Sequence, residues 1–160
     1  MHDAMTVYFD GEKYAGLLLA CMAAAALLAA LVIFRARLDL RSFAVTLAAL
    51  ALAQVALGVG LYLRTGPQVN RLVEQLGSDA ASLRAAEGAR MARVQRNFVI
   101  VEYVEVAIIV VCAFVALTQK HRPVLTGIAL GLLINASFLL AFDLIAERRG
   151  AAYLAAIDRG

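Results

Sequence analysis

Three carboxyl side chains stand inside long apolar segments, where a charge is costly. Glu102 and Glu105 lie within the apolar segment 98–118, and Asp143 lies near the end of the segment 124–145. A charge at the centre of a membrane-spanning helix costs about 2.5–3.5 kcal/mol on insertion scales, so such a carboxyl either carries a proton or pairs with a cation. These residues are the first candidates for chemistry in this chain.

A functional role and a structural role for these carboxyls predict different neighbours. Glu102 and Glu105 are three residues apart and so share one face of a helix. A functional pocket would use the carboxyls to bind a proton, a cation or a lipid head group. A structural ion pair would instead place an arginine beside them, and the candidate partners on the same side of the membrane are Arg64, Arg96, Arg148 and Arg149.

Two amide side chains are expected near the middle of the bilayer, and we assign them to the same intramembrane polar pocket. Gln54 is eleven residues beyond Phe43, and Asn135 is eleven residues beyond Val124. At 1.5 Å per residue, both lie about 17 Å from the side of the short connections. A hydrogen bond between the two amides would hold two helices together, and contact with a substrate is the alternative.

Motifs for other chemistry are absent from the sequence. The histidines His2 and His121 lie outside the apolar segments, and the two cysteines, Cys21 and Cys112, do not form a CxxC motif. There is no HExxH, P-loop or GxSxG pattern. We therefore expect no metal, no cofactor and no enzymatic activity.

The elements that must position these groups are four long apolar helices. The chain has 160 residues, of which 63% are hydrophobic, against roughly 45–50% in soluble domains. A spanning helix needs about 20 apolar residues, and a helix satisfies its own backbone amides in lipid. The sequence predicts an all-α integral membrane protein, a four-transmembrane-helix bundle of one domain (residues 1–160), with spans at about 14–34, 43–63, 98–118 and 124–145.

The connections between the predicted spans are unequal. Two are short and basic, and Pro123 suits the first turn of a helix because proline lacks an N–H. The connection 64–97 is long and polar, and its apolar residues recur at helical spacing. We predict a helical extramembrane extension here, between spans two and three. Gly77 is the expected C-cap of its first helix, and Ser78 or Asp79 is the expected N-cap of the next.

Small residues are expected to bring the spans close together, because lipid is as apolar as the side chains and gives them no other reason to associate. Span four contains Gly127 and Gly131, four residues apart. Small residues also recur at multiples of four residues in two other spans. They are Ala48, Ala56 and Gly60 in span two, and Gly16, Ala20 and Ala24 in span one. We interpret them as packing within one bundle, with a face for self-association as the alternative.

The net charge of +3 is attributed to basic flanks of the spans and not to nucleic-acid binding. The first span has one lysine before it and several arginines after it, which favours termini on the periplasmic side of a bacterial inner membrane. A sum over all flanks favours the opposite orientation, because the connection 64–97 holds six arginines. We predict periplasmic termini, and we expect residues 147–149 to form a solvated flank.

Three functions are compatible with these features. The leading hypothesis is a non-catalytic accessory or partner-binding protein of the immunity type, which docks through the segment 64–97. The first alternative is a small oligomeric transporter or channel for protons or cations that uses Glu105 and Glu102. The second is lipid binding, in which carboxyls and arginines of one leaflet hold a zwitterionic head group. The expected partners are membrane lipid, a protein or another copy of the chain.

Overall fold

The structure, a computed structural model, describes residues 2–36 and 38–159, and almost all of these residues are helical. Each of the four long helices is long and apolar enough to cross a membrane, as the sequence predicted. The elements are α1 (His2–Ala36), the short 3₁₀ helix η1 (Leu38–Leu40), α2 (Arg41–Ser78), α3 (Ala80–Thr118) and α4 (Pro123–Asp158).

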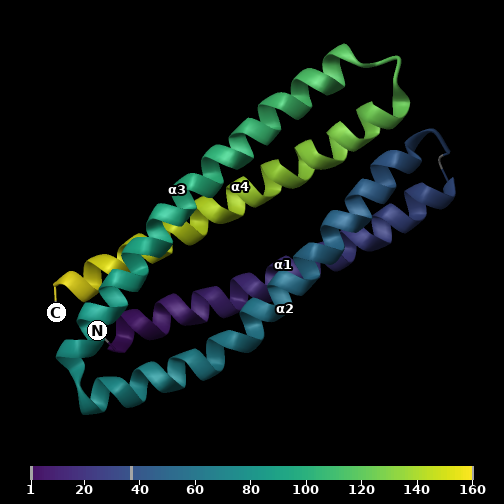
Figure 1. Ribbon diagram of the computed structural model, residues 1–160. Helices are drawn as coiled ribbons and strands as arrows, with labels where there is room; N and C mark the ends of the chain where they lie inside the picture. The colour runs from purple at the N-terminus through teal and green to yellow at the C-terminus, as the bar shows by residue number, and fades with distance from the viewer. Residues whose placement is uncertain (1, 37, 160) are drawn as a thin grey trace.

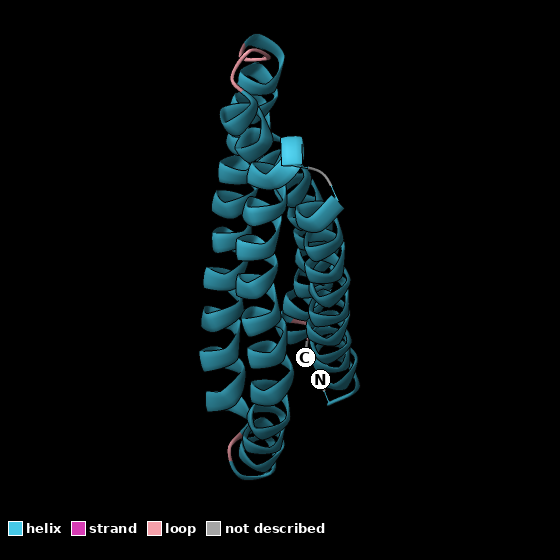
Figure 2. Ribbon diagram, turned by 90° about the vertical axis from the view of Figure 1, so that its right-hand side faces the viewer, coloured by secondary structure: helices cyan, strands magenta, loops and turns pink. Residues whose placement is uncertain are grey.

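The four helices form two antiparallel hairpins. Figure 1 shows α1 along α2 and α3 along α4, with the connections inside the hairpins at one end and both termini at the other. The turn between α2 and α3 lies at the end that holds the termini. The hairpins pack on each other mainly through α2 and α4, and the perpendicular view shows them side by side (Figure 2).

Buried residues recur at intervals of seven along the helices. On α2 they are Ala44, Ala51, Gly58, Thr65 and Leu72, and the corresponding residues on α4 are Ala129, Ala136, Gly150 and Ile157. A seven-residue repeat is slightly shorter than two helical turns and is typical of helices wound left-handedly around one another. On α3 the seven-residue spacing joins Glu105 and Cys112, and Met91 lies two such intervals before Glu105, so Glu105 belongs to the line of residues that faces the interior.

The closest approach of α1 and α2 depends on two facing glycines. A Cβ atom on Gly58 would lie 2.6 Å from the carbonyl oxygen of Gly16, and one on Gly16 would lie 2.7 Å from the carbonyl oxygen of Gly58. Backbone atoms cannot turn aside as a side chain can, so any larger residue at either position would push the helices apart. The predicted packing of Gly16 is therefore confirmed, and Gly58 is an interface residue that the sequence analysis missed.

The two predicted glycines of α4 pack against α2. A Cβ atom on Gly127 would lie 2.9 Å from the backbone nitrogen of Phe43, and one on Gly131 would lie 2.9 Å from Cγ2 of Thr46. Both glycines thus allow the two hairpins to approach closely, as the sequence predicted.

The small-residue lines predicted on α1 and α2 are wrong in part. Ala24 is exposed, and a Cβ atom on Gly60 would meet nothing within 4 Å. The prediction followed a four-residue spacing, whereas the interface follows the seven-residue spacing. On α1 the buried residues at that spacing are Gly16, Ala23 and Ala30.

The predicted helix ends are largely confirmed. Pro123 lies in the first turn of α4, and the Asp79 carboxylate caps α3 by accepting a 3.1 Å hydrogen bond from the backbone N–H of Ser82. The prediction of Gly77 as a C-cap is wrong, because α2 continues through it to Ser78. Among the described residues no glycine has the positive φ that such a cap uses.

The segment 64–97, which the sequence analysis predicted as a helical extension, does not lie alone in the structure. The prediction confined the extension to 64–97, but the first part of α1 and the last part of α4 run alongside that segment (Figure 1). We call this end of the molecule the terminal bundle and define it as residues 2–13, 64–97 and 146–158. All four helices contribute to it, so it is no longer a single projecting hairpin.

The terminal bundle has a hydrophobic core of its own. The rings of Tyr8 and Tyr153 stack with centroids 4.8 Å apart, and Phe9 meets Tyr8 edge-on at 5.0 Å. Aromatic pairs of this kind add about 0.5–1.5 kcal/mol to the gain from burial. The other fully buried members of this core are Met5, Leu72, Leu83, Met91 and Ile157.

The segment 147–149 is packed, which corrects the expectation of a solvated flank. The Arg149 guanidinium donates a hydrogen bond to the backbone carbonyl of Gly11 on α1. The carbonyl of Glu147 accepts a 3.2 Å hydrogen bond from the side-chain amide of Gln95 on α3. The first bond joins α4 to the other hairpin, and the second lies within the hairpin of α3 and α4. Only Arg148 of the three residues is exposed.

Candidate functional site

Glu105 is the most deeply buried carboxyl of the apolar part of the molecule. Only 6% of its surface is exposed, because the seven-residue line of α3 turns it toward the other helices. Its Oε2 atom has no hydrogen-bond partner. A buried, unsatisfied oxygen of this kind costs about 1–3 kcal/mol, and more if it is charged. Such a group persists in a fold when it is used or when a proton satisfies it.

Glu102 and Asp143 complete a cluster of three carboxyls around this position. Glu102 lies one helical turn before Glu105 on α3, and its Oε1 atom is also buried without a hydrogen-bond partner. Asp143 approaches from α4, near enough for its charge and that of Glu102 to act on Glu105. The fold thus brings together the three carboxyls that the sequence analysis singled out.

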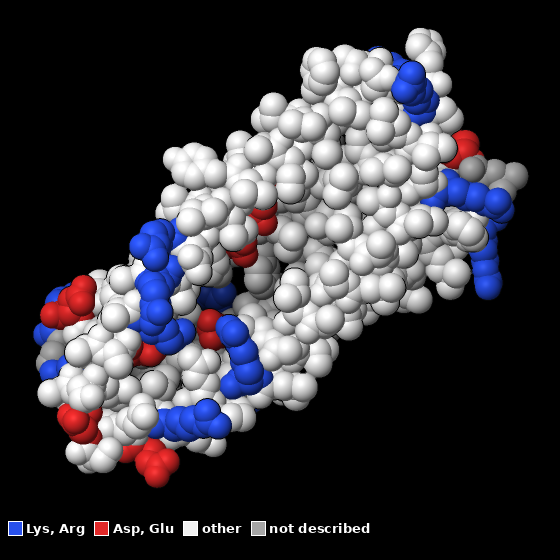
Figure 3. Space-filling model, in the orientation of Figure 1, with Lys and Arg blue, Asp and Glu red and all other residues white. Residues whose placement is uncertain are grey.

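No arginine neutralises this cluster in the part of the chain that the structure describes. Arg64, Arg96 and Arg148 are all exposed, and none lies within ion-pair distance of the three carboxyls. Arg149 is directed to the backbone of α1. On the face shown in Figure 3, Lys and Arg gather at the two ends of the molecule, and the broad band between them shows only a few Asp or Glu atoms.

The cluster does not have the geometry of a metal centre. Among the described residues, no group of three His, Cys, Asp or Glu side chains is placed to hold a metal ion. Asp143 and Glu102 are near enough to Glu105 for their charges to act on it. Adding a proton to one of them removes a charge without requiring convergent ligands.

Gln54 and Asn135 form the hydrogen bond that the sequence predicted. The side-chain amide of Gln54 on α2 donates to Oδ1 of Asn135 on α4, with 2.9 Å between the atoms. Gln54 is buried and Asn135 is half-buried. This bond joins the two helices through which the hairpins meet. It links them at a depth close to that of Glu105, which lies thirteen residues from the short-connection end of its span against eleven for Gln54.

Replacing Gln54 with Leu is expected to lower the free energy of unfolding by about 0.6–2 kcal/mol, because Asn135 loses its donor in an apolar interface. Asn135→Leu should have a similar effect. Thermal melting of the two single variants and the double variant, followed by circular dichroism in detergent, measures the coupling. Losses that simply add in the double variant would show that the two amides do not stabilise each other.

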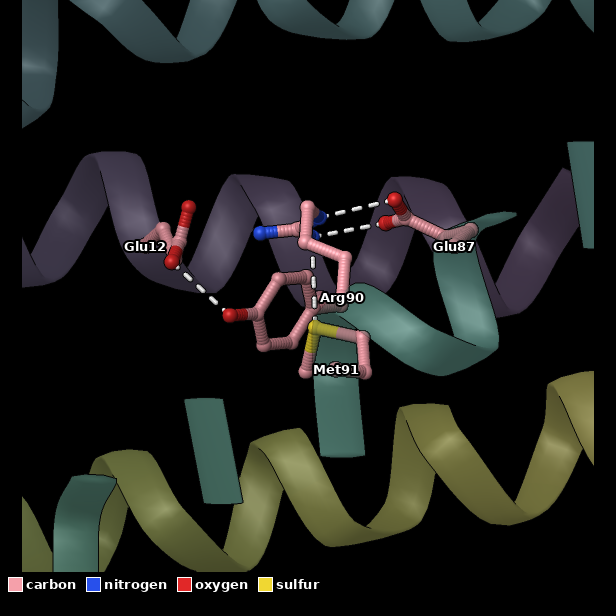
Figure 4. A network of polar contacts seen from close by, with 5 residues as sticks. Glu12, Glu87, Arg90 and Met91 are labelled. Atoms are coloured by element: carbon pink, nitrogen blue, oxygen red, sulfur yellow. Dashed lines mark hydrogen bonds and ion pairs between the residues drawn. The ribbon is translucent and has the colours of Figure 1, made fainter. Parts of the chain in front are cut away.

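A second polar group lies inside the terminal bundle and was not anticipated from the sequence. Arg90 donates two hydrogen bonds, of 2.7 Å and 2.6 Å, to the carboxylate of Glu87, of which only 3% is exposed (Figure 4). The guanidinium also lies 5.9 Å from the centre of the Phe9 ring. The spacing of Glu87 and Arg90, three residues apart on one helix, could have indicated the ion pair. The Phe9 ring that covers it could not have been inferred, because it comes from the distant N-terminal segment.

Nearby, the Tyr8 hydroxyl donates a 2.8 Å hydrogen bond to Glu12. Burial raises the pKa of Tyr8 and that of Tyr153 above the ordinary phenol value, with the negative charges of nearby glutamates as a further cause. Both phenols therefore stay neutral in any physiological range of pH. The hydrogen bonds to Glu87 raise the pKa of Arg90, so this ion pair stays charged. We interpret the group as structural, because the buried carboxylate of Glu87 is paired with Arg90.

Models of known protein families, curated proteins and solved structures were compared with this chain, and none of them matches it. The class of protein is therefore defined by its own architecture. The four apolar helices indicate a multi-pass membrane protein built as an all-helical bundle. Its two distinctive features are the uncompensated carboxyl cluster and the terminal bundle.

Proposed function

We propose that the four helices cross the inner membrane of a bacterial cell through their apolar parts, at about 14–34, 43–63, 98–118 and 124–145, and that the terminal bundle stands outside the hydrocarbon region. A helix of 20 residues already spans the roughly 30 Å of hydrocarbon. The four helices have 35 to 39 residues each, so every one of them has a part left over. The charged residues and the separate aromatic core of the terminal bundle support its position in water.

We further propose that the protein exchanges protons at Glu105, as part of a proton-coupled transporter or channel. The observation that carries this proposal is the burial of Glu105 at membrane depth without a cation or a hydrogen-bond donor at Oε2. Ionisable residues inside membranes pair with one another or mark proton and ion paths. Because the ion-pair alternative has no arginine near the carboxyls, the proton-carrying alternative has the better support.

The order of the carboxyls along the bundle suggests the side of access. Counted from the short-connection end of the spans, Glu105 is thirteen residues deep, Glu102 sixteen and Asp143 nineteen. These counts correspond to depths of about 20, 24 and 29 Å. Asp143 is thus nearest the terminal bundle and Glu105 nearest the midplane. A proton would enter past Asp143, be passed to Glu102 and reach Glu105.

The experiment that tests this function is proton flux in liposomes. Purified protein is reconstituted with a trapped pH-sensitive dye, and a potassium gradient with valinomycin supplies the driving potential. We expect proton uptake above that of protein-free liposomes. Flux equal to the protein-free control would remove the support for proton transport by the protein alone.

A second candidate function is the binding of a partner protein through the terminal bundle. The specific observation in its favour is the separate hydrophobic core, which makes this end a rigid folded unit. Deleting Pro67–Arg90 would not be a clean test, because it would expose Tyr8, Phe9 and Tyr153. Native mass spectrometry of protein taken from its own membrane is the better measurement. A stoichiometric second protein would support this function, and a homo-oligomer alone would favour transport.

The orientation with periplasmic termini remains a prediction from the charges that flank the first span. It is tested by fusing a reporter that is active only in the periplasm, or one that fluoresces only in the cytoplasm, to the C-terminus. Activity of the periplasmic reporter would support the prediction. Fluorescence of the cytoplasmic reporter would show that the summed charge of the terminal bundle decides the orientation.

A further inference from the structure

A groove on α2 carries basic side chains that have no acidic partner. It has a volume of about 470 Å³ and is lined by Arg64, Pro67, Gln68, Arg71, Leu72 and Gln75. Of the lining residues only Leu72 is fully buried, so the groove is open to the outside and its polar side chains are free to meet a ligand.

The polar residues of the groove share one face of the helix. Positions 64, 68, 71 and 75 are three or four residues apart, which places their side chains in one row. Among the residues that the structure describes, neither Arg64 nor Arg71 has an ion-pair partner. The two guanidinium groups and the two amides offer many N–H donors, and guanidinium matches the geometry of a phosphate. The row is therefore suited to an anion with several oxygens.

The groove begins where the expected span of α2 ends. Arg64 directly follows the apolar segment 43–63, and Arg71 is about 10 Å further along the helix. Beside this point, the Lys13 ammonium of α1 lies 5.0 Å from the centre of the Tyr62 ring. Lysine and tyrosine at the end of an apolar stretch are typical of the membrane interface. Residues of α1 and α2 thus place the beginning of the groove at the level of the lipid head groups.

We propose that this groove binds the phosphate of an anionic phospholipid head group, with Arg64 and Arg71 as its main ligands. Gln68 and Gln75 donate to the remaining oxygens, while the exposed ring of Pro67 provides an apolar surface for the glycerol backbone. The proposal rests on the insertion of the helices in a membrane but not on proton exchange at Glu105, so either can fail without the other.

The test is native mass spectrometry of the full chain in detergent, titrated with phosphatidylglycerol or with phosphatidylcholine. We expect phosphatidylglycerol to bind at least tenfold more tightly than phosphatidylcholine, and we expect the double variant R64Q/R71Q to lose that preference. The matched control is R93Q/R159Q, which removes the same charge from two exposed positions outside the groove and should behave as wild type. Arg64 and Arg71 are exposed, so their replacement should leave the melting temperature unchanged.

Three results would overturn the proposal. The first is equal binding of the two lipids to the wild-type protein, and the second is a double variant that still prefers phosphatidylglycerol. The third comes from inorganic phosphate: if it displaces phosphatidylglycerol at millimolar concentration, the site recognises a free anion and not a lipid. Flotation of the protein with vesicles reports membrane insertion separately, so a failure of insertion is distinguishable from a failure of the site.

Discussion

Glu105→Gln should reduce proton flux in liposomes to about a tenth of the wild-type rate or less, because the amide cannot take up and release a proton at the deepest position of the carboxyl cluster. Glutamine keeps the shape of the side chain and supplies a donor in place of a buried unpaired oxygen. The variant should therefore fold, and its melting temperature should equal or exceed that of the wild type. Dye-based flux and a thermal melt on the same preparation measure both effects.

The control for this prediction is Glu74→Gln, which makes the same chemical change at an exposed carboxyl of the terminal bundle. It should leave the flux unaltered. Glu102→Gln should give a smaller reduction than Glu105→Gln, because Glu102 is half-buried and nearer the end of the span. Normal flux in the Glu105 variant would mean that the buried carboxyl is not on the proton path.

Gly58→Leu should separate α1 from α2 and lower the free energy of unfolding by about 3 kcal/mol or more, at the upper end of what overpacking causes. The new side chain would collide with the backbone of Gly16, where even a Cβ atom would lie 2.6 Å from the carbonyl oxygen. Neither helix can yield without losing the other contacts of the hairpin. The midpoint of thermal or chemical unfolding in detergent measures the loss.

Gly60→Leu is the matched control, because it is the same substitution two residues along the same helix. A Cβ atom at Gly60 would meet nothing within 4 Å, and leucine favours a helix over glycine by about 0.8 kcal/mol. This variant should be as stable as the wild type or slightly more stable. Similar stabilities for the two variants would show that α1 and α2 do not approach each other closely at Gly58.

The polar pairing at the centre of the bundle could be predicted because it depends on depth. Gln54 and Asn135 lie equally far from the short connections, so hairpins of straight helices bring them to one level. The same counting placed Glu102, Glu105 and Asp143 in one half of the membrane. Depth along a helix is fixed by a rise of about 1.5 Å per residue, which is a property of the backbone and does not depend on what surrounds it.

The rotation of each helix about its axis could not be predicted in the same way. Ala-rich spans offer small residues on several faces, and a shift of one residue turns a helix by about 100°. The sequence analysis therefore placed Gly60 in an interface and overlooked Gly58. Whether Glu105 met an arginine was a question of rotation as well. Only the packing of all four helices determined that Arg64, Arg96 and Arg148 turn outward.

The sequence by itself determined that this chain forms four long apolar helices, since a run of about 20 apolar residues must satisfy its backbone internally. It also determined which polar groups lie far from the ends of the predicted spans. The tertiary structure alone decided that the terminal bundle is a four-helix unit with its own core. The physical reason is that Tyr8, Leu83 and Tyr153 come from parts of the chain about 70 residues apart, and their short segments gain a common apolar interior only when both hairpins are packed together.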